Sequence, residues 1–157
     1  MRRLERNILN GPIAAALSQR SYRSRWLGPA AIASPIYNCG MYSAQVLDHF
    51  QNPRNTGEIQ NADARVQIEN PACGDVLELT AKIAGERIAE IRFRAKGCVS
   101  AMACSSALTE MVAGRTVEEA RALTREELLR RVGGLPAASG HAAYLAMDAL
   151  QALLKQV

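Results

Sequence analysis

Three short loops hold the residues of this sequence that are best suited to bind a metal ion. Cys73 and Asp75 flank a glycine in "NPACGD", Cys98 follows a glycine in "KGCVS", and His141 follows one in "ASGHAAY". Two thiols, an imidazole and a carboxylate suit a borderline-soft metal. The set fits tetrahedral zinc, and it equally fits the four protein ligands that an iron–sulfur cluster needs. The spacing alone does not separate these two possibilities.

Each of these residues also has a purely structural interpretation. Cys98 lies at a predicted helix start, where backbone N–H groups favour the thiolate, but a small buried hydrophobe is the alternative. Asp75 could simply stabilise a turn. Cys73 is poorly placed for a core because turns lie at the surface. His141, taken alone, could be an exposed residue near a helix start.

The remaining thiols and the second histidine are weaker candidates. Cys104 falls on the second turn of a predicted helix beside Ala107 and Leu108, and we expect it to be buried core, as free cysteines usually are. Six residues along a helix correspond to about 9 Å of rise and about 240° of rotation. Cys98 and Cys104 could therefore reach one ion only if Cys98 lies before the helix. His49 is expected to be a surface or packing residue.

The elements that must position these loops follow from the apolar pattern. Alternating apolar residues predict three strands, at 65–69, 76–83 and 88–95. Short connections and one polar face indicate an antiparallel meander. Helical spacing and capping signals predict helices near 43–52, 100–113 and 140–156, and two short ones that open at Thr116 and Thr124.

Strands followed by helices predict an α+β fold, with a three-stranded antiparallel sheet and helices packed on one face. In such a domain, one strand–strand loop and two helix-entry loops can lie at the same end. That arrangement would bring Cys73, Asp75, Cys98 and His141 together.

The first forty residues differ in composition from the rest. They hold six arginines and one acidic residue, with no sustained helical or strand period. A mitochondrial targeting segment has this composition, and the alternatives are a disordered extension or a start codon upstream of Met41. We predict a disordered or targeting-like extension at 1–40 and one domain at 41–157. The expected location is the cytoplasm, or the mitochondrial matrix if 1–40 is a presequence; Cys39 receives no role.

Charge, hydropathy and cysteine usage exclude several classes of protein. The net charge of +4 resides in the arginine-rich start, so the domain has no basic patch to track nucleic acid. No apolar run approaches the roughly 20 residues that cross a membrane. Four cysteines without a C-x-x-C pair do not form a disulfide-dense secreted scaffold, and a reducing compartment fits best.

Four stretches, in order, resemble the NifU amino-terminal/IscU family of iron–sulfur cluster assembly scaffolds: "YSAQVLDHFQNPRNTG", "NPACGD", "KGCVSAMACSSALTEMV" and "LPAASGHAAYLAMDAL". The resemblance spans residues 41–157. It implies an α+β fold and a transient 2Fe–2S cluster, built from iron and from sulfur that a cysteine desulfurase delivers. Cys73, Asp75 and Cys98 match the family's first cysteine, its aspartate and its second cysteine. His141 matches the histidine before the third cysteine.

The resemblance also implies a role and partners. As a scaffold or carrier, the protein would not be an enzyme, and its further partners would be ferredoxin, a frataxin-like protein and recipient apo-proteins. Asp75 would be a weak oxygen ligand that keeps the cluster exchangeable. One alternative is a degenerate family member that acts as a zinc-binding or protein-interaction module. Another is a thiol enzyme that uses Cys98 with His141, although no oxyanion-hole or substrate motif supports it.

The chain departs from the family pattern at three places. Ala142 lies where the family has its third cysteine, which is the usual sulfur acceptor and a cluster ligand. "LPAAS" at 135–139 replaces the Leu-Pro-Pro-Val-Lys stretch that a chaperone recognises in the IscU branch, which puts a chaperone contact in doubt. Cys104 lies where the family usually has serine. The chain also lacks the insertion between Cys98 and His141 that marks the zinc-containing SufU branch.

Overall fold

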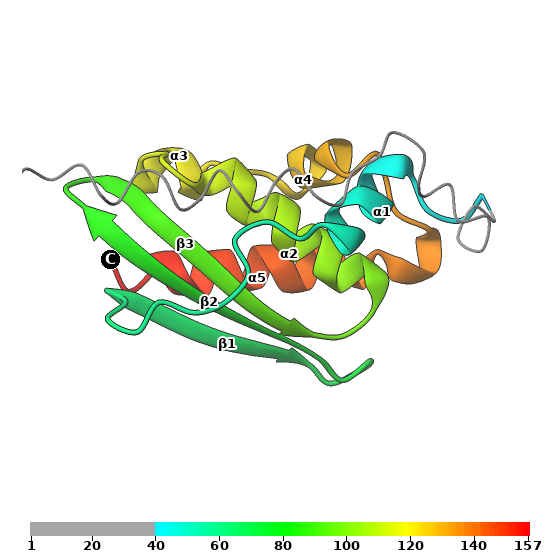
Figure 1. Cartoon of the computed structure of the whole chain (residues 1–157), viewed down its shortest axis with the longest axis horizontal. Coiled ribbons are helices and arrows are strands. Elements are labelled where there is room, and N and C mark those ends of the chain that lie inside the picture. The colour runs from blue at the N-terminus through cyan, green and yellow to red at the C-terminus, as the bar shows by residue number, and fades with distance from the viewer. Residues whose placement is uncertain (1–39) are drawn as a thin grey trace, which may run out of the picture. The chain divides into compact units, whose positions relative to one another are not determined.

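The computed structural model describes residues 40–157. The predicted extension therefore lies outside the described residues, apart from Gly40, and so does Cys39. The described part forms a unit of its own, in which a sheet makes one layer and the helices make the other (Figure 1). This is the α+β architecture that the sequence predicts.

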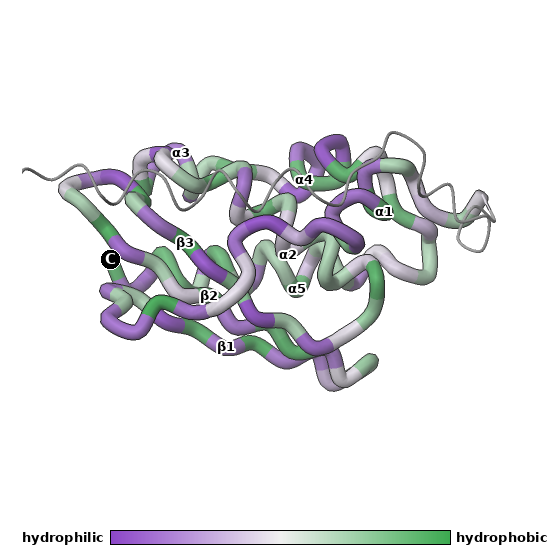
Figure 2. The backbone as a smooth tube through the Cα atoms, in the orientation of Figure 1, coloured by the Kyte–Doolittle hydropathy of each residue, from purple (hydrophilic) through white to green (hydrophobic). Residues whose placement is uncertain are grey.

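The sheet is an antiparallel meander with the strand order β1-β2-β3. Its strands are β1 (Ala64–Asn70), β2 (Asp75–Ala84) and β3 (Arg87–Lys96). Hydrophobic and hydrophilic residues alternate along them (Figure 2), so one face packs on the helices and the other carries charged side chains. On the charged face, Arg65 pairs with Glu58 and Glu78.

The helices begin where the sequence predicts them. They are α1 (Ala44–Gln51), α2 (Val99–Val112), α3 (Val117–Arg121), α4 (Arg125–Arg131) and α5 (His141–Leu154), with a short 3-10 helix η1 (Ala137–Ser139) before α5. Ser43 caps α1 by accepting a hydrogen bond from the Val46 N–H. Thr116 and Thr124 each open a capping box, which confirms both predicted helix starts.

The core lies between the sheet and the two long helices. Helix α2 contacts β3 and α5, and α5 contacts β1 and β2. Small side chains on α2 and α5 let these helices approach closely, and they surround larger residues from the strands, such as Leu77, Leu79 and Phe93. The domain is therefore held by close packing of many small groups rather than by aromatic clusters.

Helix α1 buries a histidine beside an apolar residue. Its buried residues are Val46 and His49. These two residues are three positions apart and share a side of the helix. His49 is therefore not a surface residue, and its contacts are described below.

Candidate metal centre

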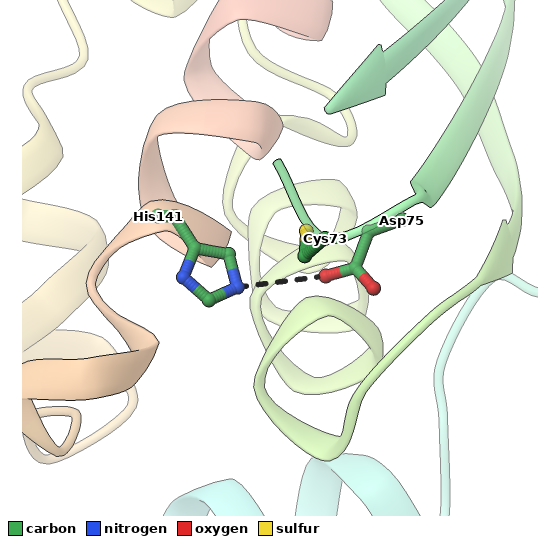
Figure 3. Close-up of side chains that lie close together, drawn as sticks. All are labelled: Cys73, Asp75 and His141. Carbon is green, nitrogen blue, oxygen red and sulfur yellow. Dashed lines mark ion pairs between the residues drawn. The ribbon is translucent and has the colours of Figure 1, made fainter. Parts of the chain in front are cut away.

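The antiparallel register brings the candidate residues to one end of the sheet. Cys73 lies in the turn between β1 and β2, and Asp75 is the first residue of β2. Val76 pairs with Lys96, so the start of β2 lies beside the end of β3, where Cys98 follows. His141 begins α5. Figure 3 shows Cys73, Asp75 and His141 turned toward one another.

The ligand atoms of three of these residues form a compact group. The Cys73 sulfur, one carboxylate oxygen of Asp75 and one ring nitrogen of His141 all lie within 4.8 Å of one another. Cys98 joins the group through Asp75, because its thiol donates a hydrogen bond to Oδ2 of Asp75 at 3.5 Å. We call Cys73, Asp75, Cys98 and His141 the metal centre.

Asp75 contacts both Cys98 and His141 in the metal centre. Its carboxylate is buried, its Oδ1 accepts a hydrogen bond from the Cys98 backbone N–H at 3.3 Å, and its Oδ2 lies 3.7 Å from Nε2 of His141. Cys98 therefore gives each buried carboxylate oxygen a hydrogen-bond donor, its backbone N–H to Oδ1 and its thiol to Oδ2. Moving this carboxylate would change the surroundings of both Cys98 and His141.

Cys73 is held by a tight turn and remains exposed. Its backbone N–H and that of Gly74 donate to the Asn70 carbonyl, and Gly74 has a φ of 71°, in the left-handed region that glycine adopts without strain. Loss of hydration raises the pKa of the Cys73 thiol, and the nearby Asp75 carboxylate raises it further. A hydrogen bond with the Asp75 backbone acts in the opposite direction and lowers this pKa. A bound cation would offset this rise by stabilising the thiolate.

Cys98 lies before its helix, not within it. It is the N-cap of α2, with φ −77° and ψ 170°, and its sulfur accepts a hydrogen bond from the Ala101 N–H at 3.4 Å. A thiolate at this position faces the positive end of the helix dipole. The side chain is partly exposed, so an ion that arrives from solvent can reach it.

Cys104 does not join the metal centre. It lies on α2 and is fully buried in the hydrophobic core, and this burial raises the pKa of its thiol to about 12. A thiol with so high a pKa rarely supplies a thiolate ligand. The expectation that Cys104 is buried core is confirmed. Ala142, next to His141, is also buried.

His49 belongs to a second polar cluster that the sequence did not reveal. Its Nδ1 lies 2.9 Å from the Ser106 hydroxyl and 3.3 Å from Nη1 of Arg54, and its Nε2 lies 3.8 Å from the Glu110 carboxylate. Ser106 also accepts a hydrogen bond from the Arg54 backbone N–H at 2.8 Å. We call His49, Arg54, Ser106 and Glu110 the His49 cluster. It ties α1 to α2.

Desolvation lowers the pKa of His49, and the Arg54 guanidinium lowers it further. The imidazole is therefore held neutral inside the protein. The one sequence signal for the burial of His49 was its position, three residues after Val46 on a short helix. It carried no indication of Ser106, which is 57 residues away along the chain.

Comparisons with known proteins identify the family to which this chain is similar. Residues 41–156 match the family model for the NifU-like N terminal domain. The iron–sulfur cluster assembly scaffold protein IscU 1 of Archaeoglobus fulgidus is 47% identical over 111 residues, which cover 71% of this chain and 72% of that one. The IscU scaffold protein of Escherichia coli K12 is 41% identical over 117 residues, covering 72% of this chain and 91% of that one.

A solved structure shows the same fold at lower sequence identity. The N-terminal part of a nitrogen-fixing NifU-like protein from Brucella abortus superposes with a TM-score of 0.62 at 21% identity, and the match covers 74% of this chain and 93% of that one. With the family match over the whole described domain, this chain belongs to the NifU-like N-terminal domain family, together with the IscU scaffold proteins.

Proposed function

We propose that this protein is a scaffold that holds a transient iron–sulfur cluster and passes it to recipient proteins. The observation that carries the proposal is the metal centre, in which two thiols, an imidazole and a carboxylate converge at the open end of the sheet. Four protein ligands of this kind are what a 2Fe–2S cluster requires. The names of the relatives at 41–47% identity support the same function.

The proposed ligands differ in how strongly they bind iron. Thiolates of Cys73 and Cys98 are the soft ligands that bind iron firmly. His141 supplies an imidazole nitrogen, and Asp75 supplies a harder, weaker oxygen. When iron binds, the proton of the Cys98 thiol, which points at Oδ2 of Asp75, must leave. A ligand set with one weak member suits a cargo that is meant to move on.

The scaffold chemistry consists of ligand exchange rather than turnover of a small substrate, so we infer that the protein is not an enzyme. Iron and sulfide are the cargo, with a cysteine desulfurase as sulfur donor and apo-proteins as recipients. A ferredoxin and a frataxin-like protein are further partners that this role implies. Zinc suits the same donor set, and it serves below as a probe of the site.

The third cysteine of the family is Ala142 here, so the proposed ligand set omits it. Four donors remain without this residue, which is enough for one cluster. The segment at 135–139, where the chaperone-binding stretch would lie, forms the loop that leads through η1 into α5. Its altered sequence leaves a dedicated chaperone out of the proposed partners.

The location of the protein is also a proposal. Cys73, Cys98 and Cys104 are free thiols, and a compartment that keeps thiols reduced would preserve them. On this ground we propose the cytoplasm as its location, with the mitochondrial matrix as the alternative if residues 1–40 are a presequence. Among residues 40–157, no helix is long and apolar enough to cross a membrane.

Cluster transfer tests the proposal. The purified protein is incubated anaerobically with ferric iron and sulfide, desalted, and mixed with an apo-ferredoxin in the presence of a chelator that traps free iron. We expect iron and sulfide in equal amounts on the desalted protein, followed by the visible circular dichroism of holo-ferredoxin. Failure to retain sulfide, or iron that the chelator takes before the ferredoxin does, would contradict the scaffold function.

A further inference from the structure

Gly97 leaves a space that the Asp75 carboxylate occupies. A Cβ atom built on Gly97 would lie 2.6 Å from Oδ1 of Asp75, 2.7 Å from its Cγ and 3.0 Å from its Cβ. Distances this short are well inside van der Waals contact. Any side chain at position 97 would therefore have to displace the carboxylate.

The backbone does not explain this glycine. Gly74, in the neighbouring turn, has a positive φ, but Gly97 is not among the residues in the left-handed region. The φ of Gly97 therefore does not by itself require a glycine. What position 97 requires is the absence of a side chain, and the atoms that impose this requirement belong to Asp75.

The space beside Gly97 determines which groups the Asp75 carboxylate can contact. From it, Oδ1 reaches the Cys98 backbone N–H and Oδ2 reaches the Cys98 thiol, and Oδ2 also faces His141 at 3.7 Å. We propose that Gly97 is a positioning residue, which seats Asp75 between Cys98 and His141 and thereby sets how readily the metal centre releases its cargo. The effect on release rests on the proposed scaffold function, whereas the seating itself does not.

The proposal predicts that Gly97→Ala resembles removal of the carboxylate. Both variants take the carboxylate away from its place between Cys98 and His141, so we expect Asp75→Ala and Gly97→Ala to change the half-life of a reconstituted cluster in the same direction. In the metal-free protein, both should expose the Cys98 amide to hydrogen exchange. Loss of a hydrogen bond to a charged group should speed that exchange roughly tenfold.

Gly140→Ala is the matched control. Gly140 precedes His141 as Gly97 precedes Cys98, and its φ of −58° suits alanine. The nearest atom to a Cβ built there is the Ala137 carbonyl oxygen at 3.6 Å, an ordinary contact. This variant places a methyl group beside the other end of the metal centre without touching the carboxylate. It should exchange and release like the parent.

A double-mutant cycle tests whether Gly97 acts through Asp75. Asp75→Gly is the partner variant, because the Asp75 Cβ is itself 3.0 Å from the added atom. Cys98 amide exchange is measured by NMR on the metal-free forms of the parent, Gly97→Ala, Asp75→Gly and the double variant. Cluster half-life is measured on the same four proteins after anaerobic reconstitution.

We expect Gly97→Ala to speed Cys98 exchange in the parent and to add nothing in the Asp75→Gly protein. If Gly97→Ala alone does not fold, the double variant should fold as Asp75→Gly does. Parent-like exchange in Gly97→Ala, or an undiminished effect in the Asp75→Gly background, would overturn the proposal. If no cluster forms on the parent, the scaffold function fails, and the exchange measurement still decides whether Gly97 seats the carboxylate.

Discussion

The metal centre and the His49 cluster each pair an imidazole with a carboxylate, at nearly the same distance and with opposite burial. His141 lies 3.7 Å from Asp75, with the histidine side chain 36% exposed and the carboxylate 6% exposed. His49 lies 3.8 Å from Glu110, with the histidine 5% exposed and the carboxylate 38% exposed. The pairs differ in which partner faces solvent.

This difference separates a candidate binding site from a structural cluster. At the metal centre, the open imidazole and the thiol of exposed Cys73 can meet an ion that comes from water, and the buried carboxylate orients them. In the His49 cluster, Nδ1 of the imidazole is already satisfied by Ser106 at 2.9 Å. A buried, hydrogen-bonded histidine with neutral charge fixes the contact between two helices. We therefore expect substitutions in the first region to change metal binding and those in the second to change stability.

The largest effect should come from removing an exposed thiol of the metal centre. Cys73→Ser keeps the shape of the turn but replaces a soft ligand with a poor one. Zinc affinity, measured by competition with a chromophoric chelator, should fall by about 100-fold or more. Loss of a residue that only hydrogen-bonds to a metal ligand already lowers metal affinity by about 10–100-fold. The melting temperature of the metal-free protein should not change, because Cys73 is exposed. Parent-like zinc affinity would remove Cys73 from the ligand set.

The next largest effect should be a loss of stability when a hydrogen bond of the His49 cluster is removed. Ser106→Ala would leave His49 Nδ1 and the Arg54 backbone N–H without their buried hydroxyl partner. The free energy of unfolding should fall by about 1–3 kcal/mol, as measured by urea denaturation, with zinc affinity unchanged. Ser105→Ala is the control, because the Ser105 hydroxyl only donates to the Ala101 carbonyl of its own helix. A loss of zinc affinity in Ser106→Ala would mean that the two regions are coupled.

A smaller effect should appear as pH dependence. The pKa of His49 is lowered from 6.5 in the folded state, so below pH 6.5 the unfolded chain takes up a proton that the folded protein resists. Stability should therefore fall as the pH drops from 7.5 to 5.5, by at most about 1.4 kcal/mol for each pH unit. The charged groups that act electrostatically on the ring are Arg54, Glu110, Asp48 and Arg131.

Urea denaturation at several pH values tests this assignment. His49→Gln should flatten the slope, whereas His141→Gln, which changes the exposed histidine, should leave most of it. An equally steep slope in His49→Gln would assign the pH dependence to another group. The carboxylates with lowered pKa, such as Asp48 and Glu119, titrate below this window.

The smallest effect should come from restoring the family's third cysteine. Ala142→Cys adds a thiol directly after His141, and we expect a modest increase in cluster half-life. Ala142 is buried in the core, so an overpacking cost of about 1 kcal/mol is expected. Ala143→Cys is a control with equal burial one position along α5. Equal half-lives in the two variants would mean that position 142 offers no ligand.

The fold and the positions of the candidate ligands could be predicted because their signals are local. Alternation of apolar residues predicts the strands, and capping residues such as Thr116 and Thr124 predict helix starts. Cys73, Cys98 and His141 share a glycine neighbour and a loop position, which are visible in the sequence. Their role as ligands stays a prediction, although the structure brings them together.

The remaining features depend on contacts across the fold, which no local pattern encodes. Gly97 and Asp75 are neighbours because the antiparallel register places the start of β2 beside the end of β3. His49 meets Ser106 because α1 packs on α2. Neither contact leaves a periodic or compositional trace.

The most direct measurement compares the two thiols of the α2 region, Cys98 and Cys104. Cys98→Ser keeps an N-cap oxygen for the Ala101 N–H but removes the thiolate, and Cys104→Ala removes only a buried sulfur. Iron and acid-labile sulfide are determined on both variants and the parent after identical anaerobic reconstitution and desalting. We predict parent-like iron and sulfide on Cys104→Ala and almost none on Cys98→Ser. A cluster retained by Cys98→Ser and lost from Cys104→Ala would contradict the proposed metal centre.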